Sequence, residues 1–312
     1  MRGLVLAAGF GTRLRPLTAH VPKALAPVCG IPLLERTLSL LSSEALGPFI
    51  VNTHHLHDQI AEFAGRSPCP FEISHEKERI RGTGGAIHHA RAFLGEAPRF
   101  FVCNVEPLKT APLGDAIRRF EQSGAVCGLL STPVESGGTI FARADSDDYL
   151  GTCDDDLEGV PLRQFCYIGT AFYRREFLDL LADNDFSVVP VWRRAQQQGL
   201  RTVIVPETSG AYWRDIGTPS EFARAHFDRL ENRSPLDVPT GLIIDDARRC
   251  CFPKALDAAH HERIGEYSWL ETDALPESTS LAHTVVLPGS VLEPNRHYSH
   301  VVVTPWGEMP FA

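Results

Sequence analysis

The stretch "LAAGFGTRLRPLT", residues 6–18, leaves a short apolar run, turns on two glycines and at once presents two arginines. Glycine lets the backbone come close to an anion and exposes amide N–H groups to it. Arg13 and Arg15 follow the second glycine, and Lys23 arrives in the segment "VPKAL". A strand, a glycine loop and three cations favour a triphosphate-binding loop; the alternative is an ordinary glycine turn with surface arginines.

This loop differs from the two best-known phosphate-binding sequences. It lacks the G-K-[ST] ending of a Walker loop. It also lacks the third glycine of a dinucleotide fingerprint, and Pro16 prevents a helix from starting where pyrophosphate would dock.

Outward from the loop, apolar runs alternate with helical patterns through the first half of the chain. The expected strands are residues 3–8, 49–54, 71–76, 99–104 and 200–206, and the expected helices are residues 32–46, 55–64, 83–94 and 218–233. This alternation predicts an α/β fold, Rossmann-like, with a mainly parallel mixed sheet flanked by helices. Ligands of such sheets bind beyond the carboxyl ends of the strands.

Two later regions break the alternation. Between residues 131 and 164 the pattern loosens, and the acidic segment 145–159 is expected to be a loop whose three consecutive aspartates favour a solvated turn over a metal site. Beyond Pro235, apolar residues recur near a six-residue spacing, at Ile264, Leu270, Leu275, Leu281 and Leu287. That period is typical of hexapeptide β-helix repeats over one or two coils; the alternative is an irregular cap with accidental spacing.

We therefore expect a main domain over residues 1–235 and a C-terminal cap over residues 236–312, the cap being a candidate fragment of left-handed β-helix. The cap is expected to serve homo-oligomer assembly or to cover the main domain, and to leave phosphate chemistry to the first 233 residues.

Composition narrows the class of protein. The 312 residues are 43% apolar and 22% charged, with a formal net charge of −9, which argues against a nucleic-acid-binding surface but allows a small anionic ligand. No window is long and apolar enough for a membrane span. Eight scattered cysteines without metal spacing, and a start that lacks a charged leader, predict a reduced, cytoplasmic location.

The longer spacing G-x-G-T-R-x-x-P-x-T, followed by P-K-A-L, P-V, G and P-L-L-E, resembles the nucleotidyltransferase family that makes nucleotide sugars from sugar 1-phosphates. The segments "GTGGAI" (82–87), "YIGTAFY" (167–173) and "YWRDIGTP" (212–219) match in the family's order, so the resemblance covers about residues 1–233. The segment "VNTHHLHDQI" (51–60) favours the mannose-1-phosphate guanylyltransferase-like and muramate-type uridylyltransferase-like branches.

The resemblance implies a transferase of nucleotide-sugar biosynthesis that moves NMP from an NTP to a sugar 1-phosphate, releasing pyrophosphate and giving an NDP-sugar. Its partners would be the nucleoside triphosphate and the sugar 1-phosphate, with Mg²⁺ as cofactor. Two anions must be held together while charge develops on the leaving group, which needs cations and a metal. The implied site residues are Arg13 and Lys23 for catalysis; Leu6, Ala8, Gly9, Gly11, Thr12, Arg13, Gly82 and Thr83 for the nucleotide; Asn104, Gly169 and Thr170 for the sugar phosphate; and Glu106 and Asp215 for the metal.

Two departures from the family pattern leave an alternative open. The family's N-G-D is here Asn104, Val105 and Glu106, which lengthens the metal-binding carboxylate by one methylene. The lysine that the family often places before residue 165 is missing, and Arg163 is the positional candidate to replace it. The alternative is a catalytically degenerate regulator or subunit that binds nucleotide sugars.

Overall fold

The computed structural model describes all 312 residues, and the chain forms two compact units. Unit 1 contains residues 1–9 and 37–213, and unit 2 contains residues 10–36 and 214–312. The chain leaves unit 1 inside the glycine loop and returns to it within helix α2 (Leu33–Ser43). No helix has both the length and the apolar character that a membrane span requires.

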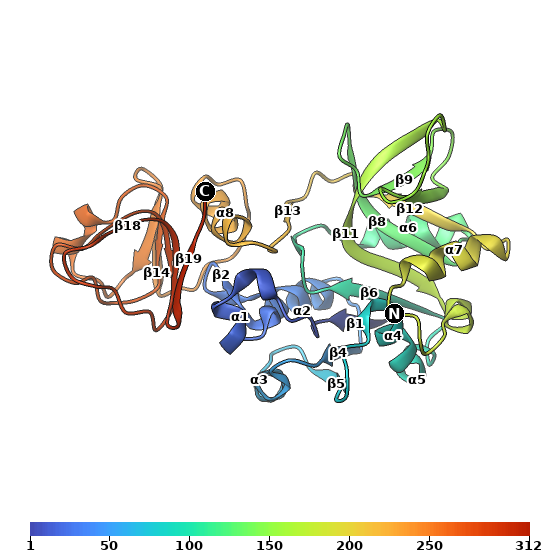
Figure 1. Cartoon of the computed structure of the whole chain (residues 1–312), viewed down its shortest axis with the longest axis horizontal. Coiled ribbons are helices and arrows are strands. Elements are labelled where there is room, and N and C mark those ends of the chain that lie inside the picture. The colour runs from blue at the N-terminus through green and yellow to red at the C-terminus, as the bar shows by residue number, and fades with distance from the viewer. The chain divides into compact units, whose positions relative to one another are not determined.

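Unit 1 is built on a nine-stranded sheet, whose longest row has the order β10-β9-β11-β6-β1-β4-β5 (Figure 1). Strand β8 pairs with β11 and with β12. The strands are β1 Arg2–Leu6, β4 Phe49–Thr53, β5 Phe71–His75, β6 Arg99–Asn104, β8 Cys127–Val134, β9 Ile140–Arg143, β10 Tyr149–Thr152, β11 Leu162–Arg174 and β12 Thr202–Pro206. Strands β6, β1, β4 and β5 run in parallel, whereas β11 is antiparallel to β6, β8 and β9. The predicted mixed α/β sheet is thus confirmed.

The remaining elements of unit 1 connect these strands. The expected helix over residues 83–94 is divided at Ala90, whose backbone leaves the helical region. The elements are α3 His57–Ala64, α4 Gly82–His89, α5 Arg91–Leu94, β7 Leu108–Lys109, α6 Gly114–Ser123, η3 Arg175–Leu180 and α7 Val189–Gln197, and β13 Trp213–Arg214 spans the boundary to unit 2.

Strand β11 shows why helices cover both faces of the sheet. Alternate side chains of a strand point to opposite faces. Ala171 and Tyr173 join a buried cluster that includes Trp192 of α7. Phe172, between them, points the other way and stacks on Phe120 of α6 with ring centroids 5.9 Å apart. Both faces are therefore apolar, which agrees with the nearly continuous hydrophobic run of this strand.

The prediction of an acidic loop over residues 145–159 is wrong in part, because β10 lies within it. Tyr149 of β10 is buried, and the strand pairs antiparallel with β9. The aspartate run forms the turn that follows: Asp155 accepts a hydrogen bond from the Thr152 backbone N–H at 2.7 Å and pairs with Arg193 at 2.5 Å. The hydrogen bond from Thr152 is the main reason why the pKa of Asp155 is lowered. The contacts of Asp155 with Thr152 and Arg193 therefore hold this turn in place.

Unit 2 begins with short elements around a hairpin. Residues 10–36 form η1 Thr12–Leu14, α1 Leu17–His20, η2 Lys23–Leu25, and the paired strands β2 Pro27–Val28 and β3 Ile31–Pro32. The Arg36 guanidinium donates to the carbonyl oxygens of Val28, Cys29 and Asp237, so one side chain ties this hairpin to the later part of the unit.

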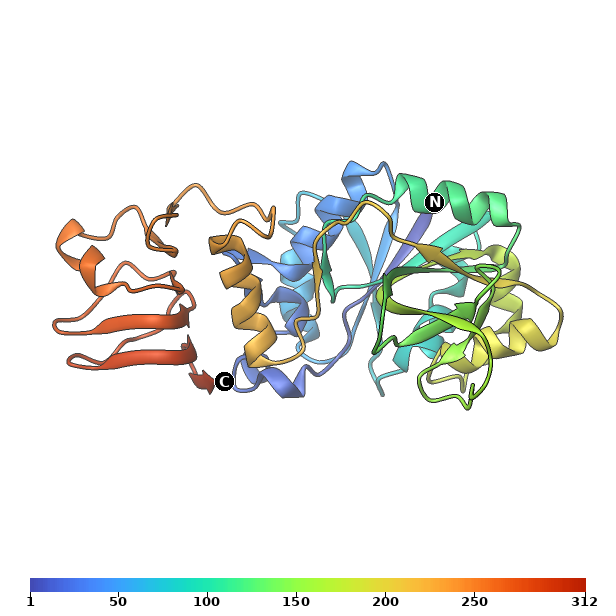
Figure 2. The same cartoon turned by 90° about the horizontal axis from the view of Figure 1, so that it is seen from above.

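The later part of unit 2 consists of helix α8 (Pro219–Leu230) and a six-stranded sheet. The Thr218 hydroxyl accepts a hydrogen bond from the Glu221 N–H, which caps α8 as the sequence predicts. The sheet strands are β14 Leu242–Asp245, β15 Cys250–Pro253, β16 Ser268–Leu270, β17 Ser280–Val286, β18 His297–Thr304 and β19 Gly307–Pro310, with η4 Ala258–Arg263 between β15 and β16. Figure 2 shows the last strands lying side by side next to α8.

The four middle strands are parallel and in register, as in β-helix coils. Cys251 pairs with Trp269, Trp269 with Val285, and Val285 with Val302, so the coils repeat every 16 to 18 residues, close to three hexads. All five apolar residues of the six-residue pattern are buried: Ile264, Leu270, Leu275, Leu281 and Leu287. The six-residue spacing therefore reflects regular, paired strands, and the segment is not an irregular cap with accidental spacing.

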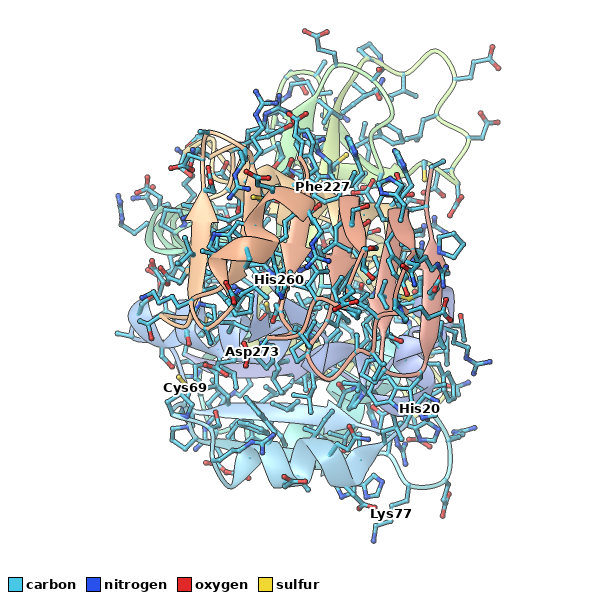
Figure 3. The ribbon with its side chains drawn as sticks, turned by 90° about the vertical axis from the view of Figure 1, so that its left-hand side faces the viewer. His20, Cys69, Lys77, Phe227, His260 and Asp273 are labelled. Carbon is cyan, nitrogen blue, oxygen red and sulfur yellow. The ribbon has the colours of Figure 1, made fainter.

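A column of left-handed residues marks one corner of the coils. Arg249, Tyr267, His283 and His300 have φ between 48° and 54°, and they occupy equivalent places in successive coils. The three rings of this column contact one another: Tyr267 and His283 are tilted with centroids 5.2 Å apart, and His283 stacks on His300 at 4.9 Å. Phe227 of α8, labelled in Figure 3, packs edge-on against Tyr267. The column therefore joins α8 to the coils.

Candidate active site

In unit 1, a cavity of about 200 Å³ opens where the parallel strands end. We call it the nucleotide cavity; it is lined by Leu6, Ala8, Gly9, Asn52, Ile80, Gly82, Thr83, Asn104 and Glu106. Leu6 ends β1 and Asn104 ends β6, so the cavity lies at the carboxyl edge of the sheet, where ligands of such folds bind. It brings together seven residues named from the sequence: Leu6, Ala8, Gly9, Gly82, Thr83, Asn104 and Glu106.

A buried polar network forms one side of this cavity, and sequence analysis missed it. Asn52 Oδ1 accepts from the Ala7 N–H at 2.6 Å, and its Nδ2 donates to Glu76 Oε1 at 2.8 Å. Glu76, only 1% exposed, accepts from the Arg81 N–H at 2.7 Å through its other oxygen. The network fixes the loop before "GTGG" to the strand ends. Its one signal in the sequence is Asn52, a polar residue inside the apolar strand "FIVNT".

The "GTGG" segment forms the start of α4 and packs closely against the backbone around Phe186. A Cβ at Gly82, whose φ is +68°, would lie 2.1 Å from the Phe186 carbonyl oxygen, so only glycine fits there. Thr83 Oγ1 accepts a hydrogen bond from the Val188 N–H at 2.9 Å. The segment thus holds the start of α7 beside the cavity.

The turn after β6 carries the predicted Glu106. Gly169 (φ +74°) lets the turn pass, since a Cβ would lie 2.6 Å from Pro107 and 3.1 Å from the Glu106 carbonyl oxygen. The buried Lys109, which sequence analysis did not select, donates to the carbonyl oxygens of Asn104 and Pro107 at 3.3 and 3.5 Å. The Lys109 ammonium therefore lies against this turn, whereas the lysine that the family often has before residue 165 is missing.

The three predicted sugar-phosphate residues are placed differently. Asn104 lines the nucleotide cavity, Gly169 packs on the turn, and the buried Thr170 directs its hydroxyl to Cys103 Sγ at 3.5 Å. Arg163 donates to the Ser146 carbonyl oxygen and to Asp147, and it lines neither cavity described here. The roles of these four residues in sugar-phosphate binding stay predictions.

A second cavity of about 310 Å³ shares Leu6, Thr83 and Asn104 with the first. We call it the aromatic cavity, because Tyr167, Tyr173 and Trp192 line it together with Ile87, Val102, Ile140, Val188 and Val189. Trp192 Nε1 donates to the Tyr173 hydroxyl at 3.2 Å, and Tyr167 packs edge-on against Trp192 at 5.9 Å. These interactions fix the aromatic wall of the cavity. Its polar residues are Asn104, Thr83, Thr139, Thr152, Cys153, Asp154 and Ser187.

In unit 2, the predicted Arg13, Lys23 and Asp215 come together, and we call them the triphosphate set. A Cβ at Gly217 would lie 2.5 Å from Arg13 Nη2, so the guanidinium lies against the segment that follows Asp215. Burial lowers the pKa of Lys23 to about 8; the charge of Asp215 opposes the shift and that of Arg13 adds to it. A lysine whose charge is poorly solvated is well suited to bind a phosphate.

A hydrogen bond and close packing hold the glycine loop that precedes Arg13. Thr18 Oγ1 donates to the Gly11 carbonyl oxygen at 2.7 Å, and Gly11 (φ +61°) precedes the short helix that begins with Thr12. A Cβ at Gly11 would lie 3.1 Å from Lys23 Cβ, so Gly11 and Lys23 are neighbours. Four sequence-predicted residues thus meet: Gly11, Thr12, Arg13 and Lys23.

A neutral histidine supports the hairpin that follows. Burial lowers the pKa of His226 to about 4, so its Nε2 accepts from the Cys29 N–H at 3.1 Å while Nδ1 donates to the Phe222 carbonyl oxygen at 2.9 Å. Burial likewise raises the pKa of Glu271 to about 7, and its carboxyl accepts from Trp269 Nε1 at 2.7 Å.

An α/β sheet with a glycine loop after its first strand and cavities at its strand ends has the arrangement in which such folds bind their ligands. The model of the family described as Nucleotidyl transferase matches residues 2–137. The chain is 33% identical over 232 residues to N-acetylmuramate alpha-1-phosphate uridylyltransferase of Caulobacter vibrioides, an alignment that covers 69% of this chain and 91% of that protein. It is 25% identical to mannose-1-phosphate guanylyltransferase 1 of Arabidopsis thaliana, covering 77% and 69%.

Solved structures share the fold. HddC from Yersinia pseudotuberculosis, complexed with GMP-PN, superposes with a TM-score of 0.57 at 21% identity, over 72% of this chain and 98% of that one. A UDP-glucose pyrophosphorylase complexed with UDP-glucose gives 0.61 at 16% identity, over 74% and 99%. The chain belongs to the sugar-1-phosphate nucleotidyltransferase family, whose members are enzymes, and the alternative of a degenerate regulator is not favoured.

Proposed function

We propose that the protein catalyses Mg²⁺-dependent uridylyl transfer from UTP to the 1-phosphate of an N-acylated amino sugar of the muramate type. The observation that carries the transfer chemistry is the triphosphate set, which joins two cations and a carboxylate next to a glycine loop. The choice of base and sugar class is supported by the Caulobacter relative, which aligns over 91% of its length.

In this proposal the phosphate oxygen of the sugar 1-phosphate attacks the α-phosphorus, and the bond to pyrophosphate breaks. Arg13 would bind β- and γ-phosphate oxygens with its planar fork of N–H donors, and the Gly11 and Thr12 amides would add backbone donors. Lys23 would place a point charge on the α-phosphate. Pyrophosphate leaves as a highly charged anion, so these fixed cations lower the barrier by meeting charge where it develops.

The acidic residues fit magnesium. Mg²⁺ is usually held by one or two carboxylates and by substrate phosphates, not by an all-protein cage. Unit 1 presents Glu106 in the nucleotide cavity and unit 2 presents Asp215 in the triphosphate set, while no group of three or more metal-ligating side chains is assembled. Glu106 and Asp215 are each a candidate ligand of the ion, as the family pattern implies, and the ion when bound would neutralise phosphate charge.

The aromatic cavity supports an acylated sugar. Three of its hydroxyls have fixed orientations: Thr83 accepts from the Val188 N–H, Thr139 accepts from the Tyr167 N–H, and Thr152 donates to Asp155. The remaining polar residues of the cavity, Asn104, Cys153, Asp154 and Ser187, can meet sugar hydroxyls, and the apolar walls can receive the methyl group of an acyl substituent. A hydrophobic substituent buried there gains about 25 cal/mol per Å² of apolar surface.

A second candidate is guanylyl transfer to mannose 1-phosphate, because the Arabidopsis relative carries that name. The deciding experiment measures pyrophosphate release with Mg²⁺ for UTP, GTP, TTP and ATP, each paired with N-acylated amino-sugar and plain hexose 1-phosphates. We expect the highest kcat/KM for UTP with an acylated sugar. A preference for GTP with mannose 1-phosphate would support the second candidate, and no release with any pair would refute the proposed function.

A variant tests the sugar cavity. Val189→Thr should reduce the preference for acylated over plain sugars several-fold, because it places a hydroxyl on the apolar wall. Val291→Thr, at a position that is 85% exposed in unit 2, is the matched control and should keep the preference. An unchanged preference in Val189→Thr would separate this wall from sugar recognition.

A further inference from the structure

We propose that Trp306, at the end of the C-terminal coils, is a positioning residue that holds the glycine loop in its triphosphate-binding conformation by stacking on His20. The inference rests on the proposed function, because it requires the loop to bind triphosphate. All the residues that carry it belong to unit 2.

The turn that presents Trp306 is firmly built. It joins β18 to β19, where Thr304 pairs with Gly307. Thr304 Oγ1 donates to the Gly307 carbonyl oxygen at 2.7 Å and accepts from the Trp306 N–H at 3.1 Å. The tryptophan is nevertheless 42% exposed, so the burial of its side chain in a core does not explain its position.

This turn contacts both ends of α1. The Trp306 and His20 rings stack with centroids 4.8 Å apart and planes inclined by 10°. His20, labelled in Figure 3, is the last residue of α1. Pro16 precedes the first residue, and its Cγ would lie 3.3 Å from a Cβ placed on Gly307. The turn therefore fits against α1 along its length.

Helix α1 transmits this contact to the loop. It has only four residues, and a helix that short is not stable on its own, so its order comes from packing. Thr18, in its middle, is buried and donates to the Gly11 carbonyl oxygen. The stack on His20, the hydrogen bond of Thr18 and the adjacency of Gly11 and Lys23 form one connected path from the coils to the triphosphate set.

The function of such a path is pre-organisation. A loop that is already ordered loses less conformational entropy when triphosphate binds, so removing the brace weakens binding without removing any group that touches the ligand. Aromatic stacking of this kind predicts a rise of about two- to tenfold in the KM for the triphosphate. The KM for the sugar 1-phosphate should stay the same, because the residues that line the aromatic cavity all belong to unit 1 and the braced loop belongs to unit 2.

The test uses the full chain with Trp306→Ala, Trp306→Phe and the control Val291→Ala, which alters an exposed apolar residue of the same coils. Steady-state kinetics give both KM values, and titration calorimetry gives the Kd for UTP with Mg²⁺ in the absence of sugar. We expect Trp306→Ala to raise the KM and the Kd for triphosphate, Trp306→Phe to restore most of the affinity, and Val291→Ala to match the wild type.

Three outcomes would overturn the inference. They are an unchanged Kd in Trp306→Ala, an equal rise in both KM values, and a failure of phenylalanine to restore affinity where the folded fraction is equal. A wild type that binds triphosphate but releases no pyrophosphate would refute the proposed activity and leave the calorimetric comparison decisive. A wild type that binds no triphosphate would refute both.

Discussion

Lys23 makes triphosphate binding depend on pH in a predictable direction. Burial lowers the pKa of its ammonium to about 8, whereas an exposed lysine stays charged to much higher pH. A phosphate attracts the protonated form, so binding above pH 8 requires the uptake of a proton. Affinity for triphosphate should therefore be highest below pH 8 and fall as the pH rises through that value.

The magnitude follows from the fraction of Lys23 that is protonated. With a pKa of about 8 this fraction is roughly nine tenths at pH 7 and roughly one tenth at pH 9, so the Kd should rise by about tenfold between them. The terminal phosphate, with a pKa near 6, is fully ionised over most of this range and contributes little. Lys23→Met loses a charge-assisted hydrogen bond worth about 1.5–3 kcal/mol and should bind at least tenfold more weakly at pH 7.

The assay is titration calorimetry with UTP and Mg²⁺ from pH 7 to pH 9.5 at constant ionic strength, since screening would otherwise change with the buffer. We expect the wild-type Kd to rise with pH, the Lys23→Met Kd to stay nearly constant, and the two to approach each other at pH 9.5. Lys77→Met, which removes an exposed lysine, should keep the wild-type profile. A flat wild-type profile, or an equal slope in Lys23→Met, would refute the reasoning.

Three further outcomes are expected. Arg13→Ala should weaken triphosphate binding at least tenfold in calorimetry while the circular dichroism stays native; unchanged affinity would remove Arg13 from the phosphate site. Glu106→Asp should preserve or raise Mg²⁺-dependent pyrophosphate release, and Glu106→Ala should abolish most of it; equal turnover in Glu106→Ala would exclude a metal role. Leu281→Ala should lower the free energy of unfolding by about 2–5 kcal/mol in denaturant titration, because the side chain is buried inside the coils; a change below 1 kcal/mol would contradict that packing.

The parts of the fold that follow a local period could be predicted from the sequence. The strands around residues 3–8 and 99–104 are short apolar runs, and the helix after Thr218 has its cap and first-turn glutamate in the sequence. The six-residue spacing likewise marked the coils. Strand β10 was missed because aspartates and glycine surround its four residues, and the pairing that makes it a strand comes from β9, elsewhere in the chain.

In the candidate site too, residues that form a local pattern could be predicted, and those joined by long-range contacts could not. Residues of the glycine loop and "GTGG" stand out by composition, and the structure places them around the nucleotide cavity and in the triphosphate set. The network of Asn52 and Glu76 could not be predicted, since its partners are joined by strand order and not by spacing. The buried Lys109 was also passed over, because it lies before the segment where the family usually has its lysine.

The expectation that the first 233 residues suffice for nucleotide binding stays a prediction, and unit 2 makes its test informative. A Cβ at Gly30 would lie 2.7 Å from Pro239, and Arg36 donates to the Asp237 carbonyl oxygen. The segment that follows the glycine loop therefore packs on residues that such a truncation removes.

Unit 2 consists of two segments that are far apart in the chain, which affects the order in which the protein folds during synthesis. Residues 10–36 leave the ribosome early, but their packing partners begin at residue 214, so they must wait while residues 37–213 are made. Unit 1 can form its sheet in that interval, because domains generally fold as they emerge. A nascent chain halted before Trp306 would then present the glycine loop without the contact that braces α1. Full affinity for the triphosphate would thus be among the last properties that the growing chain acquires.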